Sequence, residues 1–217
     1  MPLTLILATR NPHKVGEIRA LLGPHVQCLS LAEFPDAPAV VEDGATFEAN
    51  AVKKAQSLAQ WLRLAPAAAG RDDLNSARVL ADDSGLEVDA LGGAPGVHSA
   101  RFAALDSGQP GNSSDAANSE KLLGLLRDIP PGLRSARFRC VLALVSVRPG
   151  PAPVVVSGAC EGYIAAAARG RGGFGYDPLF LPLGCEQSFA ELDGEAKNRL
   201  SHRARALAEL RTVLELP

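Results

Sequence analysis

The sequence predicts a mixed α/β fold, with helices flanking a sheet of parallel and antiparallel strands. Short apolar runs typical of buried strands alternate with amphipathic segments of helical periodicity. Two β-rich segments, Arg137–Val147 and Val154–Cys160, are separated by a Pro-Gly turn, which predicts a hairpin and argues against a purely parallel sheet. No repeat or long linker divides the 217 residues, so we expect a single domain, residues 1–217, with room for two lobes.

The N-terminal third is predicted to hold one strand and two helices. Leu3–Ala8 is a short apolar run that suits a buried strand. A helix follows, because Asn11 can cap it, Pro12 suits its first turn and Gly23 suits its end. A second helix is expected from Thr46 to about Leu64. The predicted apolar stripes are Val15, Ile18, Leu21 and Leu22 on the first helix, and Phe47, Ala51, Leu58 and Leu62 on the second.

The remaining elements are less regular. We expect a surface loop over Pro66–Arg78 and a short strand, Val79–Ala81, that ends at Asp82 and Asp83. A third helix is predicted over Ser114–Ile129, and a last helix from about Glu195 to Leu216. The stripe of the last helix is Leu200, Leu207, Leu210 and Leu214.

Composition limits the classes of molecule that the protein is expected to bind. The net charge of −2 provides no basic field for duplex nucleic acid, so a bound polyanion must be small and held by a local cluster. Cys28, Cys140, Cys160 and Cys185 are far apart, which argues against a zinc site or a disulfide framework. With no signal peptide and no apolar run of the length a bilayer requires, we expect a cytoplasmic protein without membrane or nucleic-acid partners.

Lys14 is unusual because it lies in the first turn of a helix, where the macrodipole disfavours a cation. A strand, a tight turn and a helix N-terminus together can bind an anion through backbone N–H groups. Thr9 and Asn11 would add a hydroxyl and an amide to this site. The alternative is an ordinary strand–helix junction with a solvated lysine.

Lys54 and Arg203 occupy positions within apolar stripes. Lys54 points nearly the same way as Phe47 and Leu58, so it either extends to the surface or pairs with an acidic or anionic group inside. Arg203 lies between Leu200 and Leu207 on its stripe. A buried guanidinium needs an internal carboxylate or a bound ligand, since leaving it unpaired is costly.

The adjacent carboxylates Asp82 and Asp83 repel each other unless a cation neutralises them. Oxygen ligands of this kind suit Mg²⁺, which often bridges one or two carboxylates to substrate phosphates. Glu42 is a further candidate ligand. A turn or capping role for the two aspartates is the alternative.

The segment from Gly172 to Asp177 places Phe174 and Tyr176 in a glycine-rich backbone. Aromatic faces in such a loop can stack on a base. Many glycine-rich loops are only turns, so this signal is weak by itself.

Taken in order, these segments resemble the inosine triphosphate pyrophosphatase family, which acts on deaminated purine nucleotides. The match runs nearly end to end. It is carried by Leu7–Lys14, Thr46–Phe47, Asn50–Ala51, Lys54–Ala55, Ala81–Leu86, Gly92–Arg101, Gly172–Asp177, Lys197 and Ser201–Arg203.

The resemblance implies an elongated mixed sheet with two lobes and a central cleft, a homodimer, and Mg²⁺-dependent hydrolysis of dITP, ITP and XTP to the monophosphate and pyrophosphate. Asp83 matches the proton acceptor, with Lys14 as a second catalytic residue. The implied metal ligands are Glu42, Asp82 and Asp83. The implied substrate contacts are Thr9, Arg10, Asn11, Pro12, His13, Lys14 and Lys54 at the phosphates, and Phe174, Gly175, Tyr176, Asp177, Lys197, His202 and Arg203 toward the nucleoside. Ser84 is also implied to contact the substrate.

Two positions depart from the family pattern. Ala49 stands where a glutamate is usual, with Glu48 beside it, so any metal-binding role of that glutamate falls to Glu48 or to Glu42, Asp82 and Asp83. Arg10 replaces a small residue and adds a positive charge near the phosphates. Two other functions stay open: a pyrophosphatase for modified pyrimidine nucleotides, and a nucleotide sensor that does not hydrolyse. The sensor would be expected to lack the acidic residues.

Overall fold

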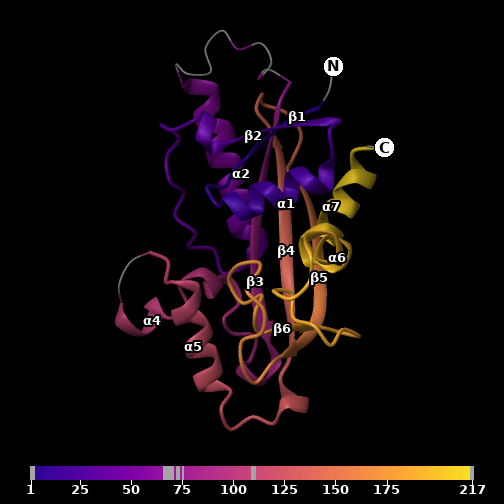
Figure 1. Cartoon of the computed structure of the whole chain (residues 1–217). Coiled ribbons are helices and arrows are strands. Elements are labelled where there is room, and N and C mark those ends of the chain that lie inside the picture. Colours follow the sequence, from indigo (N-terminus) through magenta and orange to yellow (C-terminus); the bar gives the residue numbers. More distant parts are fainter. Residues whose placement is uncertain (1–2, 66–70, 72–73, 75, 109–110, 216–217) are drawn as a thin grey trace. The chain divides into compact units, whose positions relative to one another are not determined.

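The computed structural model describes residues 3–65, 71, 74, 76–108 and 111–215. Its strands form a six-stranded sheet in the order β2-β1-β3-β4-β5-β6 (Figure 1). β1 pairs in parallel with β2 and β3, whereas β5 and β6 are antiparallel, so the predicted mixed sheet is confirmed. The strands are β1 Leu3–Leu7, β2 Val26–Ser30, β3 Arg78–Val88, β4 Ser135–Ser146, β5 Val154–Ile164 and β6 Phe180–Pro182.

Helices connect these strands. They are α1 Pro12–Leu22, α2 Phe47–Leu64, α4 Ala104–Ser107, α5 Asp115–Leu125, α6 Gly194–Leu200 and α7 His202–Val213, with short 3₁₀ turns at Leu31–Glu33, Asp89–Leu91, Gly96–Arg101 (η4) and Pro131–Leu133. No helix in the part of the chain that the structure describes is long and apolar enough to cross a membrane.

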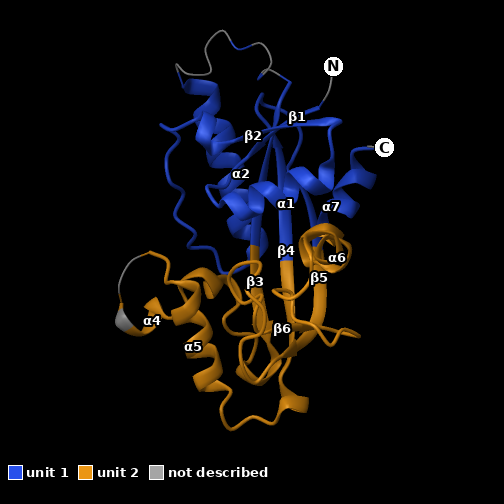
Figure 2. Cartoon of the chain, in the orientation of Figure 1, with its two compact units in different colours: residues 1–83, 140–157, 206–217 blue, residues 84–139, 158–205 orange. Residues whose placement is uncertain are grey.

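The chain divides into two compact units, and β3, β4 and β5 contribute residues to both (Figure 2). Unit 1 comprises residues 1–83, 140–157 and 206–217, and unit 2 comprises residues 84–139 and 158–205. Each unit has its own apolar core. Side chains of β1, β4, α1 and α7 build the first, and those of α5, β4 and β6 contribute to the second.

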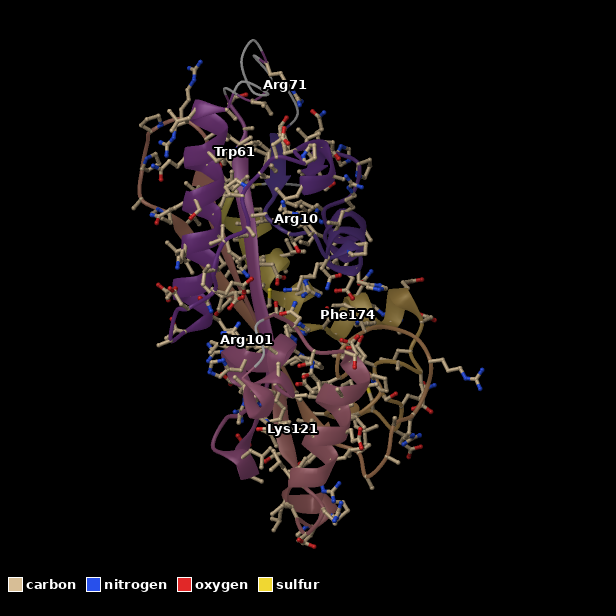
Figure 3. The ribbon with its side chains drawn as sticks, turned by 90° about the vertical axis from the view of Figure 1, so that its left-hand side faces the viewer. Arg10, Trp61, Arg71, Arg101, Lys121 and Phe174 are labelled. Carbon is tan, nitrogen blue, oxygen red and sulfur yellow. The ribbon has the colours of Figure 1, made fainter. Side chains whose placement is uncertain are left out.

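In unit 1, α1 and α2 lie on opposite sides of the strands (Figure 3). Asn11 caps α1 by accepting hydrogen bonds from the His13 and Lys14 amides, and Thr46 caps α2 through the Ala49 amide. These caps satisfy amides that the first helical turn leaves without partners. The predicted stripes of α1 and α2 are confirmed, with Val15 and Leu21 of α1 only partly buried against the core. Ile18, Leu22, Phe47, Ala51, Leu58 and Leu62 are buried.

Three predictions of local structure were wrong. β3 does not end at Asp82 but continues to Val88, so both aspartates lie inside a strand. The last helix is broken at Ser201, whose backbone is extended and whose hydroxyl caps α7 by accepting from the Ala204 amide. The loop over residues 66–78 is not entirely a surface loop, because Leu74 is buried. Residues 66–70, 72–73 and 75, and the expected helix end at Leu216, lie outside the described residues.

Gly162 illustrates how tightly unit 2 is packed. A Cβ atom added there would lie 2.3 Å from the Leu181 carbonyl oxygen of the paired strand β6, whereas one added at exposed Gly124 would meet nothing within 4 Å. We expect Gly162→Ala to lower the free energy of unfolding by about 1–3 kcal/mol through overpacking. Gly124→Ala, in the last turn of α5, should raise it by about 0.5–1 kcal/mol. Urea denaturation of both variants checks this, and equal effects at the two sites would contradict it.

Candidate functional site

Lys14 and Asp82 form the first of two lysine–carboxylate pairs in unit 1. The Lys14 ammonium lies 2.5 Å from Asp82 Oδ1, and the Asp82 side chain is 1% exposed. Cys140 on β4 donates to the other carboxylate oxygen at 3.3 Å. Asp82 thus holds a lysine from the start of α1, which explains why a cation is tolerated in that first turn.

Lys54 and Asp83 form the second pair. The Lys54 ammonium donates to Asp83 Oδ1 at 2.6 Å, to Glu42 Oε2 at 3.1 Å and to the Asp82 carbonyl at 2.9 Å. Lys54 is 9% exposed, so of the two readings of its sequence position the internal pairing is confirmed. Successive side chains of a strand point to opposite faces, so α1 supplies the partner of Asp82 and α2 that of Asp83.

Asn50 fixes the loop that carries Glu42. Its side-chain oxygen accepts from the Gly44 amide at 2.8 Å, and its Nδ2 donates to Asp83 Oδ2 at 3.3 Å. Asn50 is fully buried. A Cβ atom at Gly44 would lie 2.6 Å from Asn50 Oδ1, so the loop can approach this closely only with glycine there.

The two carboxyl groups on Lys54 titrate differently. Burial, with a smaller contribution from the neighbouring Glu42 carboxylate, raises the pKa of Asp83 to about 6 against the effect of Lys54. Burial also opposes ionisation of Glu42, but Lys54 and a hydrogen bond from Asp83 outweigh it and lower the pKa of Glu42. The pair therefore keeps a proton on Asp83 and a charge on Glu42 in mildly acidic solution.

The donor chemistry of this pair fits Mg²⁺. Two hard carboxylate groups lie close enough to share a proton, and a divalent ion can replace that proton. Among the described residues there is no cluster of three or more His, Cys, Asp or Glu side chains suited to a metal. Of the three predicted ligands, the structure therefore brings Glu42 and Asp83 together and leaves Asp82 on Lys14.

The other residues at the start of α1 take local roles. Thr9 Oγ1 accepts from the Asn11 amide at 3.2 Å, while Pro12 and His13 are exposed. Arg10 is exposed and donates to the Ala37 carbonyl at 2.6 Å (Figure 3). On α2, Glu48 and Ala49 are both exposed, so Glu48 does not occupy a buried position comparable to that of Asn50 or Lys54.

Unit 2 holds a second polar cluster around Asp177. This buried carboxylate accepts from the Phe174 amide at 2.9 Å and from the Lys197 ammonium at 2.6 Å. The same ammonium lies 5.0 Å from the centre of the Phe174 ring, a cation–π distance. Gly173 has a φ of 72°, and a Cβ atom there would lie 2.1 Å from Asp177 Oδ2, so the loop requires glycine.

Of the next two residues, Arg203 contacts this cluster through Phe174, and His202 contacts Phe138. The Arg203 guanidinium is 6.0 Å from the Phe174 ring centre and 3.4 Å from the Ser84 hydroxyl. His202 stacks on Phe138 with ring centroids 4.8 Å apart. Arg203 is 1% exposed, as predicted, although Leu200 and Leu207 proved to belong to different helices.

Tyr176 does not present a free aromatic face. Its ring is buried in the core of unit 2, and its hydroxyl donates to the Ser99 carbonyl at 2.9 Å. Burial raises its pKa, so the hydroxyl stays protonated. Of the two loop aromatics, only Phe174 is partly exposed and able to stack on a ligand.

Some contacts of the clusters were missed by sequence reasoning. Cys140 was considered only as part of the argument against a zinc site or disulfides, and Asp115, which accepts from the Gly175 amide, was not singled out. No local pattern could have found them, because their partners are 58 and 60 residues away. The sequence contained a weak indication for Asn50, because this residue lies at the edge of the apolar stripe that holds Lys54.

Lys54→Met should lower the free energy of unfolding by about 3 kcal/mol at pH 8, because it leaves buried charge without a cation. The loss should be smaller at pH 5, where Asp83 is protonated. Lys53→Met is the matched control, since Lys53 pairs with Asp43 at 2.5 Å on an exposed surface. It should change stability by no more than about 0.5 kcal/mol. Denaturant titrations at both pH values test this, and similar losses for the two lysines would refute it.

The raised pKa of Asp83 determines the direction in which stability changes with pH. The native chain keeps this proton up to about pH 6, whereas an unfolded aspartate releases it near 4. Stability present at low pH is therefore lost as the pH rises through this window. We expect the free energy of unfolding of Asp83→Asn minus that of the native sequence to increase from pH 4 to pH 7 in a chelator. A difference that stays flat would show that Asp83 is not perturbed.

Comparisons with known proteins agree with the fold and the residue pattern. A family model described as the Ham1 family matches residues 5–213. A protein of Desulforamulus reducens named dITP/XTP pyrophosphatase is 47% identical over 211 residues, covering 97% of this chain and 94% of its own.

Solved structures give the same answer. The Ham1 protein of Staphylococcus aureus is 35% identical, with a TM-score of 0.78 and 98% of each chain covered. The structure of a nucleoside-triphosphatase / dITP/XTP pyrophosphatase from Mycobacterium abscessus is 41% identical, with a TM-score of 0.68, and covers 96% of this chain and 98% of its own. The fold and the motifs thus have one common explanation: the chain belongs to the Ham1 family.

Proposed function

We propose that this chain hydrolyses the non-standard purine nucleotides dITP, ITP and XTP to the monophosphate and pyrophosphate, and so removes them from the nucleotide pool. One observation carries the proposal. The adjacent carboxylates Asp82 and Asp83 each hold a lysine, in a chain 47% identical to a protein named dITP/XTP pyrophosphatase. Acidic groups for a divalent ion and lysines for phosphates are what attack on a phosphoric anhydride requires.

We assign the phosphate end of the substrate to unit 1. Lys14 and Lys54 would hold phosphate oxygens, exchanging part of their carboxylate contacts for the more highly charged ligand. Thr9, Arg10, Asn11, Pro12 and His13 would line the same end. Asn11 already caps the first amides of α1, so the lysine ammonium groups supply more of the binding than free amides do.

Mg²⁺ is the proposed cofactor, and Glu42 and Asp83 are the residues that would hold it. When bound, it would neutralise phosphate charge and acidify a water molecule. Asp82, the third predicted ligand, we assign to orienting Lys14. Asp83 is the proposed proton acceptor, because a carboxyl group whose pKa is near 6 can accept a proton at neutral pH and pass it on.

The nucleoside end is assigned to unit 2. Phe174 would stack on the base, held in place by Lys197 and by Asp177 within the loop. His202 and Arg203 would donate to the oxygen at C6 of hypoxanthine or xanthine, where adenine carries an amino group. Ser84, bonded to Arg203, would contact the substrate as well. Gly175 and Tyr176 would contribute through the loop backbone.

We propose that residues 1–217 act as one catalytic domain, that the protein works as a homodimer, and that it acts in the cytoplasm, where nucleoside triphosphates are used. The four cysteines form no disulfide in the part of the chain that the structure describes, which suits a reducing compartment. A nucleotide sensor without activity is the less favoured alternative, because Glu42, Asp82 and Asp83 are present and paired with lysines.

Product analysis tests the function. With ITP and Mg²⁺, the purified protein should release IMP and pyrophosphate in equal amounts, and omission of Mg²⁺ should abolish the reaction. dITP and XTP should be hydrolysed as well, and GTP and ATP far more slowly. IDP and orthophosphate as products, or comparable rates with GTP, would sink the proposal. A preference for modified pyrimidine nucleotides would point to the other open function.

Asp83→Asn is the matched variant for this assay. The amide keeps the shape of the side chain but cannot accept the proton, so turnover should fall by several decades while ITP binding changes little. A variant that loses ITP binding yet turns over what it binds at the native rate would remove Asp83 from the catalytic role.

A further inference from the structure

The assignment of the loop 172–177 as the base-binding segment rests on the proposed function. Within this loop, Asp177 and Gly173 fix the backbone. Two further contacts fasten it to other elements of unit 2. The Gly175 amide donates to Asp115 Oδ2 at 2.6 Å, and the Tyr176 hydroxyl donates to the Ser99 carbonyl at 2.9 Å. Gly175 directly follows Phe174 in the sequence, and Tyr176 comes next.

The Ser99 anchor is rigid. Ser99 is 8% exposed and lies in η4. Its hydroxyl donates to the Gly96 carbonyl at 2.6 Å and accepts from the Leu86 amide at 2.9 Å. A buried side chain with both hydrogen-bonding functions satisfied has little freedom to move, so Tyr176 is held against a fixed point.

Asp115 makes the second anchor from a different element. It is the first residue of α5, which is itself fastened to η4 because Asn118 accepts from the Ala103 amide and donates to the Ala100 carbonyl. Asp115 is exposed, so it has no packing role of its own there. Its carboxylate forms a charge-assisted bond with a backbone amide next to Phe174, and such bonds are stronger than neutral ones.

We propose that Asp115 is a positioning residue for base recognition: by holding the Gly175 amide, it sets where the Phe174 ring meets the purine. Asp115 touches neither the base nor the phosphates, so its loss acts through Phe174. Asp115→Ala should raise KM for ITP roughly 3- to 10-fold with kcat changed less than about 2-fold, the effect of losing one charge-assisted hydrogen bond. The inhibition constant of inorganic tripolyphosphate, which lacks a base, should not change.

If Asp115 only stabilised α5, a different result would be expected. An acidic residue in the first turn also favours α5 through the helix dipole. The double variant Asp115→Ala with Ala116→Glu restores that charge on the exposed face of the first turn but not the bond to Gly175. Its KM should stay high. Asp115→Asn keeps an oxygen that can accept from Gly175, and should recover most of the native KM.

The results that would overturn the inference differ from the result that would overturn the proposed function. Recovery of KM by the Ala116→Glu addition, an unchanged KM in Asp115→Ala, or a parallel rise in the tripolyphosphate constant would overturn the inference. If Asp115→Ala folds poorly, Tyr176→Phe removes the other anchor and should shift KM in the same direction. The affinity for IMP, measured by calorimetry, gives the same comparison without turnover. Failure of the native protein to release pyrophosphate from ITP would instead overturn the proposed function.

Discussion

The structure of unit 1 depends on the alternation of side chains along β3. Asp82 and Asp83 are neighbours in sequence, and their negative charges would be costly together in a buried strand. Because successive side chains face opposite ways, Asp82 meets Lys14 from α1 and Asp83 meets Lys54 from α2. Each helix therefore contributes a cation as well as an apolar face. The same alternation turns Asp83 toward Lys54, where Glu42 also binds, so Glu42 and Asp83 are the two carboxylates that can share an ion.

Unit 2 is organised differently, around one buried carboxylate and the backbone that encloses it. Asp177 accepts from a loop amide and a lysine, and it fills the space next to Gly173 so closely that no side chain fits there. Lys197 connects this carboxylate to the face of Phe174. Charge and hydrogen bonding thereby help to place the Phe174 ring, whereas its neighbour Tyr176 is buried in the core.

Sequence reasoning predicted the features that local chemistry determines. The cap at Asn11, the apolar stripes of α1 and α2, and the burial of Lys54 and Arg203 all follow from residue type and helical period. It was wrong where distant partners decide. β3 continues through Asp82 and Asp83 because two helices neutralise them, and the last helix breaks because the Ser201 hydroxyl caps a new one. The motif order predicted the family, but the bonds of Cys140 and Asp115 depend on packing between distant segments.

The close approach of Asn50 to Gly44 makes the positions of Glu42 and Asp83 depend on each other. Asn50 holds the Gly44 amide with its oxygen and Asp83 with its nitrogen, and it is fully buried, so it cannot move aside for a larger residue at position 44 without breaking both contacts. A methyl group there would displace the amide side chain and disturb Glu42 and Asp83 at once. A single hydrogen atom on an α-carbon thus keeps the spacing between two carboxylates, although that carbon bears no functional group.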